Sequence, residues 1–260
     1  ISQRKQAEEE NQKLNIELEQ RVAERTVELA AKNREMEKFT YSVSHDLKAP
    51  LRGIDGYSKL LQADHAGHMN EEGRFFVQTI RHATEQMSQL IDDLLAYSRI
   101  ERRTITITQI DPRLIAEKLL AERAEDLRQN QIDTTINIDC TNVHAEPEGL
   151  SLALRNVLDN AIKFTCQVKA PRVDIGGSIQ GNKCVLWVRD NGSGFEMQYH
   201  DRIFDIFHRL HRAEDYPGTG IGLAIVRKSM QRMHGRVWAQ SEPGRGATFF
   251  LEIPIFEESV

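Results

Sequence analysis

The sequence contains few cysteines, little proline in its first hundred residues, no long apolar run and no excess of basic residues. Three cysteines, Cys140, Cys166 and Cys184, form no CxxC spacing, which argues against a disulfide framework or a zinc site. Apolar runs fall far short of the ~20 residues that cross a bilayer. A net charge of -5 and a pI near 6.0 argue against a dedicated nucleic-acid binder. These absences predict a soluble, cytoplasmic protein without nucleic acid as a partner or a membrane segment in this fragment.

The first sixty residues read as one long helix. Between Gln3 and Leu61 the only proline is Pro50, and the composition is rich in Glu, Lys, Gln, Ala and Leu. Apolar residues recur every seven positions, with two more at companion positions: Val22, Leu29, Met36 and Val43, then Leu18 and Phe39. This is a coiled-coil seam and requires a partner helix. Because the chain begins inside this charged pattern, we expect an upstream sensor domain in the same chain.

A break in the heptad pattern follows Val43. The next apolar set is Leu47, Leu51, Ile54 and Leu61, and the four-residue step is a stutter that locally unwinds a coiled coil. A second heptad run, Val77, Ile80, Met87, Ile91 and Leu94, follows a polar turn at 64–73. The pattern predicts two antiparallel helices. A lone hairpin buries both seams poorly, so we expect a homodimer with a four-helix bundle.

Near residue 104 the periodicity changes from helical to alternating, and Asp111-Pro112 is a typical helix start. The pattern then predicts helices at 112–129, 148–164 and 221–233, and strands at 132–138, 172–179, 183–189, 236–241 and 247–253. The predicted fold class is α+β, a helical hairpin followed by an α/β sandwich with helices on one face of an open sheet. The expected domains are 1–38 (signalling coiled coil), 39–103 (dimerisation hairpin) and 104–260 (α/β domain).

His45 precedes Asp46 in the first predicted helix, away from the apolar seam. A neutral imidazole is nucleophilic, and a carboxylate can hold its proton on one ring nitrogen. Adjacent helical residues point apart, so we expect a bend to bring Asp46 to His45, and Pro50 supplies a reason for one. The alternative is an ordinary exposed histidine in a kinked helix.

Three polar residues share one face of the predicted helix 148–164. Asn156, Asn160 and Lys163 are spaced by four and three residues. Amide oxygens suit Mg²⁺, and a lysine neutralises phosphate charge. The alternative is a solvated polar face.

Two glycine-rich turns complete the pattern. Asp190 ends an apolar strand before Gly192 and Gly194, and the segment 218–223 opens a helix whose free N–H groups favour phosphate. Each alone is compatible with a simple flexible turn. The segment between them, 195–217, carries basic residues suited to a mobile cover: Arg202, His208, Arg209, His211 and Arg212. His200, His208 and His211 lack the companion ligands of a metal site.

These motifs together resemble the sensor histidine kinase family from about Phe39 to Pro254. Ser44 to Leu51 is similar to its phosphoacceptor motif, and the subtype resembles PAS- or phytochrome-linked kinases. The resemblance implies an enzyme, a protein histidine kinase that uses ATP and Mg²⁺ to phosphorylate His45, with Asp46 as the adjacent acid. It also implies transfer of the phosphate to an aspartate of a response-regulator receiver domain.

The resemblance also implies roles for residues of the second domain. Asn160, helped by Asn156, would hold Mg²⁺, Lys163 would contact phosphate, and Asp190 would accept the adenine amino group. The other residues that it assigns to nucleotide binding are Phe164, Gly192, Gly194, Phe204, Phe207, Arg209, Gly218, Thr219, Gly220, Gly222, Leu223 and Thr248.

Two alternatives share much of this pattern. The asparagine and glycine motifs occur also in Hsp90- and gyrase-like ATPases, and a degenerate kinase would serve as a nucleotide-responsive dimeric scaffold. His45 on a hairpin favours the kinase. Family members that dephosphorylate their regulator carry Thr or Asn where this chain has Ala49, so we expect weak phosphatase activity.

Overall fold

The computed structural model describes residues 2–100, 105–141, 143–210, 216 and 218–255. The chain divides into two compact units, Ile1–Gly53 and Ile54–Val260, and each is considered by itself. The expected domain boundary at residues 103 and 104 lies outside the described residues, so the three-domain division stays a prediction.

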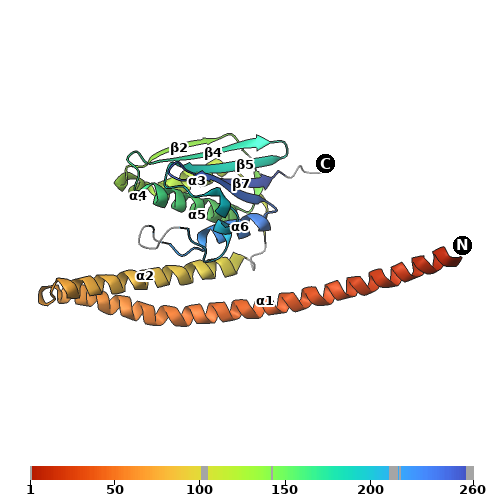
Figure 1. Cartoon of the computed structure of the whole chain (residues 1–260), viewed down its shortest axis with the longest axis horizontal. Helices are drawn as coiled ribbons and strands as arrows, with labels where there is room; N and C mark the ends of the chain where they lie inside the picture. The colour runs from red at the N-terminus through yellow and green to blue at the C-terminus, as the bar shows by residue number, and fades with distance from the viewer. Residues whose placement is uncertain (1, 101–104, 142, 211–215, 217, 256–260) are drawn as a thin grey trace. The chain divides into compact units, whose positions relative to one another are not determined.

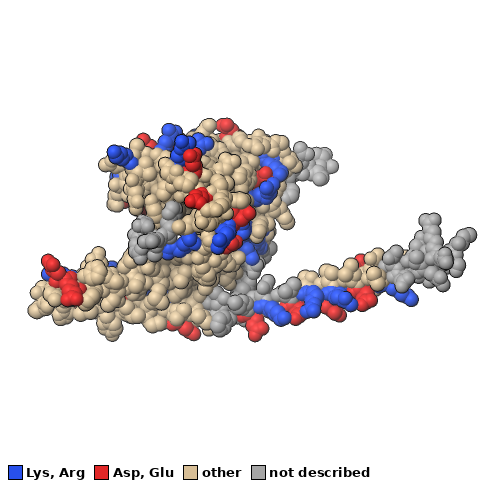
Figure 2. Space-filling model, viewed as in Figure 1, with Lys and Arg blue, Asp and Glu red and all other residues tan. Residues whose placement is uncertain are grey.

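The first unit is formed by helix α1, which spans Ser2–Asp64 and so extends beyond this unit. Its surface carries ion pairs within the helix, Arg21 with Glu17 and Lys32 with Glu28, and Figure 2 shows both signs of charge mixed along this stretch. Leu18 and Val22 of the predicted seam are 60% and 58% exposed. An apolar stripe so exposed on a long helix is typical of a seam that another helix covers.

Pro50 lies inside α1 and does not end it. The ring removes one backbone N–H, the one that the carbonyl of Asp46 would accept, and the helix continues because the turns on both sides keep their own hydrogen bonds. The prediction that Pro50 lies in a helix is confirmed.

The second unit begins with a helical hairpin. After α1 ends at Asp64, a short 3₁₀ turn, η1 (Ala66–His68), leads to α2 (Glu71–Ile100). The Asn70 side chain caps α2 by accepting the N–H of Gly73 at 2.8 Å, so the predicted turn 64–73 is shorter than expected and Gly73 is helical. Arg81 of α2 donates to Gln62 of α1 at 2.6 Å.

The hairpin buries only part of its predicted seam. Val77 and Ile91 are buried, at 7% exposure each. In contrast, Ile54, Leu61, Ile80 and Met87 stay between 45% and 48% exposed. One hairpin therefore leaves an apolar face uncovered.

The rest of the chain forms the α/β domain. Its elements are β1 (Thr108–Ile110), α3 (Pro112–Glu122), α4 (Ala124–Gln129), β2 (Asp133–Ile138), β3 (Val143–Ala145), α5 (Pro147–Thr165), β4 (Arg172–Gln180), β5 (Lys183–Asp190), η2 (Met197–Tyr199), η3 (Arg202–Phe204), α6 (Gly222–Arg232), β6 (Arg236–Glu242) and β7 (Gly246–Pro254). All five predicted strands are present, and the predicted α+β fold class is confirmed.

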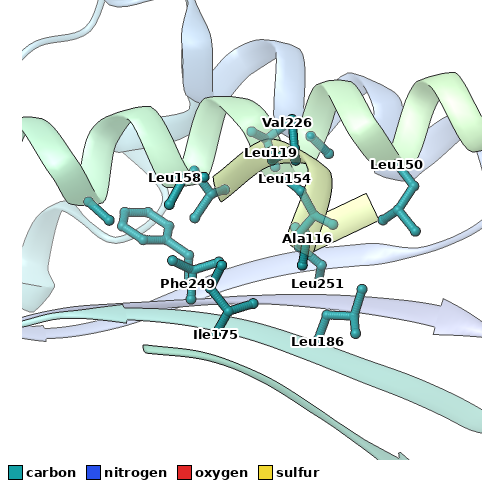
Figure 3. Packing of buried hydrophobic residues seen from close by; sticks show 14 of the residues in the cluster. Ala116, Leu119, Leu150, Leu154, Leu158, Ile175, Leu186, Val226, Phe249 and Leu251 are labelled. Atoms are coloured by element: carbon teal, nitrogen blue, oxygen red, sulfur yellow. The ribbon is translucent and has the colours of Figure 1, made fainter. Parts of the chain in front are cut away.

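A five-stranded sheet has the order β2-β4-β5-β7-β6, in which only β2 and β4 are parallel. A two-stranded sheet pairs β1 with β3. Helices α3, α5 and α6 lie on one face of the large sheet (Figure 1). Figure 3 shows the core between these layers, where Leu154 and Leu158 of α5 point toward Phe249 and Leu251 of β7. This layering predicts that functional groups gather at the ends of α5 and around the loops that follow the strands.

Two predictions about the domain's first half need correction. The single helix expected at 112–129 is two helices, because the backbone at Arg123 leaves the helical region (φ −104°, ψ 8°). The alternating segment 104–108 contributes only Thr108 to a strand, and residue 104 lies outside the described residues. Strand β3 was not predicted, since three residues are too few to show an alternation.

The three cysteines are free thiols, as expected. Cys140 and Cys184, far apart in sequence, lie together in the core, where their buried thiols hydrogen-bond to each other. Cys166 is exposed. The buried pair behaves as small core residues that satisfy each other's polar groups.

Candidate functional site

His45 lies exposed on α1, as predicted, with 69% of its side chain accessible. Its Nδ1 lies 3.2 Å from Oδ1 of Asp46. Both side chains are exposed and free to choose rotamers that meet beside a continuous helix, so the contact forms without an interruption of α1, and the bend expected at Pro50 stays a prediction. With Nδ1 engaged by a carboxylate, Nε2 is left as the accessible nucleophilic atom.

The second unit contains a cavity of about 490 Å³ between α5, α6 and the loops that join them to the sheet. This volume is in the range of sites for nucleotide-sized molecules. Twelve of the residues that the resemblance assigns to nucleotide binding line it: Asn156, Asn160, Lys163, Phe164, Asp190, Gly194, Arg209, Gly218, Thr219, Gly220, Gly222 and Leu223. Most of the predicted constellation therefore comes together in one place.

One wall is the polar face of α5. The Asn156 amide donates to Leu152 O at 2.8 Å, which directs its Oδ1 toward the start of α6, where a Cβ at Gly222 would lie 2.8 Å from it. Gly222 thus leaves room beside an amide oxygen. Asn160, one turn further along α5, has no hydrogen-bond partner among the described residues, so its amide is free to serve a ligand. Two amide oxygens on one helical face fit a hard cation such as Mg²⁺.

Lys163 lies at the same wall with its ammonium partly desolvated. Its Nζ is 4.3 Å from the centroid of the Phe164 ring and would lie 3.2 Å from a Cβ at Gly218. Burial, together with the smaller effect of the nearby Arg209, lowers the pKa of Lys163 to about 8, and Asp159 acts in the opposite direction. Two cations held close together in a partly dry cavity favour an anionic ligand.

Asp190 lies at the other side of the cavity, at the end of β5, and is 4% exposed. One carboxylate oxygen accepts the N–H of Gly192 at 2.9 Å and that of Ala247 at 3.3 Å. Burial raises the pKa of Asp190 to about 6, although these two N–H groups lower it. Its second oxygen has no hydrogen-bond partner in the described part of the chain, which leaves an acceptor for a ligand's N–H group.

The second glycine turn closes the cavity at the start of α6. Gly218 and Gly220 have φ angles of +156° and +75°, which side-chain-bearing residues rarely adopt. Between them the Thr219 hydroxyl donates to a carboxylate oxygen of Asp93 on α2. It also accepts the N–H of Ile221 at 3.3 Å. The turn thus presents backbone N–H groups at a helix start, a geometry that suits phosphate.

The segment between the glycine turns contributes His208, Arg209 and Tyr216 to the cavity lining. Phe207 has a φ of +64°, and its N–H donates to Gly220 O at 3.0 Å, so this segment is tied to the second glycine turn. Arg209 donates to Tyr216 O at 2.8 Å. Of the basic residues expected here, His211 and Arg212 lie outside the described residues.

Four predicted site residues do not line the cavity. Gly192 supports it, since a Cβ there would lie 2.4 Å from Phe164 O. Phe204 is buried beneath it, edge-on to Phe249 at 6.4 Å, while Phe207 contributes its backbone and leaves its ring 59% exposed.

The structure corrects the expected place of Thr248 in the site. It pairs with Arg189 and Gln240 across the sheet, and its neighbours Ala247 and Phe249 line the cavity instead. Because successive strand residues point to opposite faces, Thr248 points away from the cavity. Ala247, with its N–H on Asp190, holds the position that we assigned to Thr248.

Several lining residues were not predicted. Arg123 donates two hydrogen bonds to the carboxylate of Asp159, at 2.7 and 3.0 Å. The two residues are 36 positions apart, so no local sequence pattern reveals their contact. Tyr216 packs on Phe164 with ring centroids 4.9 Å apart. Its position in the sequence, just before the second glycine turn, could have indicated that it lies near the cavity. The Ser193 hydroxyl is buried without a partner among the described residues, so the first glycine turn holds a further polar atom.

The histidines of the segment have separate environments. His200 contacts Asp201 and the carbonyl of Met197, whereas His208 turns toward the cavity with its Nδ1 buried. The described residues contain no cluster of three or more His, Cys, Asp or Glu side chains with metal-binding geometry. Nor does any helix in the described part of the chain have the length and apolar character to cross a membrane.

Two family models match the chain. Residues 35–103 match the His Kinase A (phospho-acceptor) domain, and residues 145–257 match the histidine kinase-, DNA gyrase B- and HSP90-like ATPase. The first match contains His45, and the second contains every cavity wall just described except the part from α2 and Arg123.

Relatives of known name cover most of this chain. Cyanobacterial phytochrome A of Nostoc sp. is 36% identical over 247 residues, which is 93% of this chain and 32% of the relative. The methanogenesis regulatory histidine kinase FilI of Methanothrix harundinacea is 32% identical, over 89% of this chain and 26% of the relative. The chain therefore spans about a third of the length of these relatives or less.

Solved structures give the same result for the fold. Full-length ShkA in complex with AMPPNP has a TM-score of 0.66 and 25% identity, over 86% of this chain and 47% of that one. ThkA in complex with the response regulator protein TrrA has a TM-score of 0.61 and 21% identity, over 86% of this chain and 63% of that one. The two matched domains in this order, with an exposed His45 in one and the polar cavity in the other, show that the chain belongs to the sensor histidine kinase family.

Proposed function

We propose that this chain is the kinase portion of a sensor protein, which binds ATP in the cavity of the second unit and transfers the γ-phosphoryl group to His45. The observation that carries the proposal is the cavity's polarity: a buried carboxylate, Asp190, on one side and two cations, Lys163 and Arg209, on another. A purine with an exocyclic amino group and a charged phosphate tail matches this division.

Each end of the nucleotide has a group suited to it. Asp190 accepts a hydrogen bond from the adenine amino group, because its second carboxylate oxygen remains available. Lys163, Arg209 and the N–H groups of the second glycine turn neutralise the phosphates. Asn156 and Asn160 would hold Mg²⁺, which would supply positive charge for the phosphate oxygens.

His45 accepts the phosphoryl group through Nε2. Asp46 holds the proton of the neutral ring on Nδ1, which leaves the Nε2 lone pair free to attack phosphorus. The N–P bond forms as the bond between the γ-phosphorus and the bridging oxygen breaks, and ADP leaves. The positive charge on the ring is balanced by Asp46, which takes up the Nδ1 proton or shares it.

The working form that we propose is a homodimer. The apolar face that one hairpin leaves open, with Ile54, Leu61, Ile80 and Met87 exposed, suits a second copy and a four-helix bundle. The match to a phosphoacceptor domain supports transfer from His45 to an aspartate of a response-regulator receiver domain. A sensor domain in the same protein is part of the proposal, supported by relatives about three times as long. A cytoplasmic location completes it.

Labelled ATP tests the proposal directly. Incubation with MgATP should give a phosphoprotein whose label is lost in acid and kept in base, as expected for a phosphohistidine. His45→Asn should abolish the label, whereas His65→Asn, in the hairpin turn, should keep it.

Three results would contradict parts of this reading. If the label persists in His45→Asn, a residue other than His45 accepts the phosphoryl group. ATP hydrolysis without any label would favour an ATPase of the Hsp90 or gyrase kind. Nucleotide binding without label or hydrolysis would favour a scaffold.

A further inference from the structure

Arg227 of α6 contacts the residues around η3, which precede the part of the chain that places His208 and Arg209 in the cavity lining. Its Nη2 donates to Asp201 O at 3.0 Å, and its Nη1 donates to Asp205 Oδ1 at 3.3 Å. Its guanidinium carbon lies 5.1 Å from the centroid of the Phe204 ring. A single side chain thus contacts both ends of η3 and the aromatic ring between them.

Phe204 links Arg227 to the cavity wall through a further aromatic contact. The ring is 4% exposed, and it also meets Phe249 at 6.4 Å in an edge-to-face arrangement. Phe249 lines the cavity. A guanidinium on one side and an aromatic ring on the other allow Phe204 little freedom, so Arg227 helps to fix a layer directly beneath the cavity wall.

Asp205 links Arg227 to the residues that follow it through a backbone hydrogen bond. Its side chain is held by Arg227, and its carbonyl accepts the N–H of His208 at 3.3 Å, which closes the turn 205–208. This turn carries His208 and Arg209 into the cavity lining. At its far side the N–H of Phe207 is bonded to Gly220 O, so the turn is held at both ends.

Arg227 itself does not line the cavity, and 35% of its side chain is exposed. We propose that Arg227 is a positioning residue for the phosphate end of the nucleotide, which acts through Asp205 and Phe204 to set the place of Arg209. The inference rests on the proposed nucleotide site. It assigns Arg227 no contact with ATP and no part in adenine recognition.

The test compares two nucleotides that share adenine and differ in phosphate. Arg227→Met keeps the length and the apolar stem and removes the guanidinium. ATP affinity should fall about fivefold, the scale of one exposed charged contact, while AMP affinity stays the same. In autophosphorylation the KM for ATP should rise by the same factor with little change in kcat, because the acceptor His45 is untouched.

The matched control is Arg236→Met. Arg236 is exposed on β6, with its guanidinium carbon 5.9 Å from the centroid of the Trp238 ring. The variant Arg236→Met removes a guanidinium from a second cation–aromatic contact, one that lies away from η3. It should therefore leave the affinities for ATP and AMP unchanged.

Asp205→Asn tests whether the effect of Arg227 on ATP binding comes from its contact with Asp205 or from a general loss of stability. This substitution removes the charged partner of Arg227 at constant size and should weaken ATP binding in the same direction. The double variant Arg227→Met/Asp205→Asn should bind ATP no more weakly than Arg227→Met alone, because the two residues act as one unit. If Arg227→Met fails to fold, the ATP and AMP affinities of Asp205→Asn still decide the question.

Equal losses for ATP and AMP in Arg227→Met, or no loss for ATP, would overturn the inference. So would additive effects in the double variant. Failure of the proposed function looks different, since the unaltered protein would then give no label on His45 or would not bind ATP.

Discussion

The buried Asp190 carboxylate accepts the backbone N–H of Ala247, from the start of β7, at 3.3 Å. The same oxygen accepts the N–H of Gly192 in the turn that follows β5. One side chain thereby joins the ends of two adjacent strands and still has an oxygen for a ligand. Burial without a countercharge raises its pKa to about 6, so Asp190 changes charge within an accessible pH range.

Adenosine affinity should depend on that charge. An amino group donates best to the ionised carboxylate, so affinity should rise as pH increases through about 6 and then level off. Adenosine is the suitable probe because it has no phosphate to titrate. Asp190→Asn should weaken adenosine binding about tenfold at pH 7 and flatten the profile, as measured by NMR titration. Asp174→Asn, outside the cavity lining, should change neither.

The stability of the ligand-free protein should change in the opposite sense. The folded pKa of Asp190, about 6, is above the ordinary 3.8, so its favourable contribution is complete below pH 3.8 and is lost as pH rises through 6. At pH 8 the buried charge costs on the order of 2 to 3 kcal/mol. Asp190→Asn keeps an acceptor for both N–H groups and should raise the free energy of unfolding at pH 8. Urea denaturation showing no gain at pH 8 would contradict this account.

Lys163 should take up a proton when ATP binds. Its pKa of about 8 in the ligand-free site means that part of the population is neutral at pH 8.5, and phosphate stabilises the charged form. ATP affinity should therefore fall as pH rises above 8. Calorimetry in two buffers of different ionisation enthalpy should detect roughly half a proton taken up or more at pH 8.5.

Lys163→Met provides the comparison for that measurement. Without the ammonium, the proton uptake should disappear and ATP affinity should fall at all pH values. Lys169→Met, a lysine beyond the end of α5 and outside the cavity lining, should keep both. Unchanged uptake in Lys163→Met would assign the proton to another group.

The elements of the fold were largely predictable because their signals are local. The long helix α1 and the strands β5 and β7 were predicted within a few residues of their observed bounds. The break at Arg123 was not predicted, because the partner of its side chain, Asp159, comes 36 residues later and no local pattern marks the contact. Strand β3 exists through its pairing with β1 and has no pattern of its own.

The site was predictable where spacing alone sets geometry. Asn156, Asn160 and Lys163 share a face of α5 because of the helical repeat, and all three line the cavity. On a strand an error of one residue reverses the side chain, which is why Ala247 lines the cavity and Thr248 does not. Contacts formed by chain folding, such as Arg227 with Asp205, have no sequence signal.

Gly246→Ala should be among the most damaging substitutions in the domain. Gly246 has a φ of +93°, and a Cβ there would lie 2.0 Å from the carbonyl oxygen of Asp190. Gly244 has a φ of +76° with nothing within 4 Å. Gly244→Ala should thus cost about 1 kcal/mol of unfolding free energy from backbone strain alone, and Gly246→Ala about 3 kcal/mol or more. Similar losses in urea denaturation would refute the close approach.

Asp46 should affect the rate of phosphoryl transfer and leave nucleotide binding alone. Its carboxylate lies 3.2 Å from His45 Nδ1 and holds the ring in the tautomer that leaves Nε2 free. Asp46→Asn keeps the size of the side chain and cannot take up the proton, so kcat for autophosphorylation should fall about a hundredfold at an unchanged KM for ATP. Asp64→Asn, at the end of α1, should leave both constants as they are. If Asp46→Asn keeps the full rate, the contact does not set the tautomer; if it raises the KM for ATP instead, Asp46 acts on the nucleotide and not on His45.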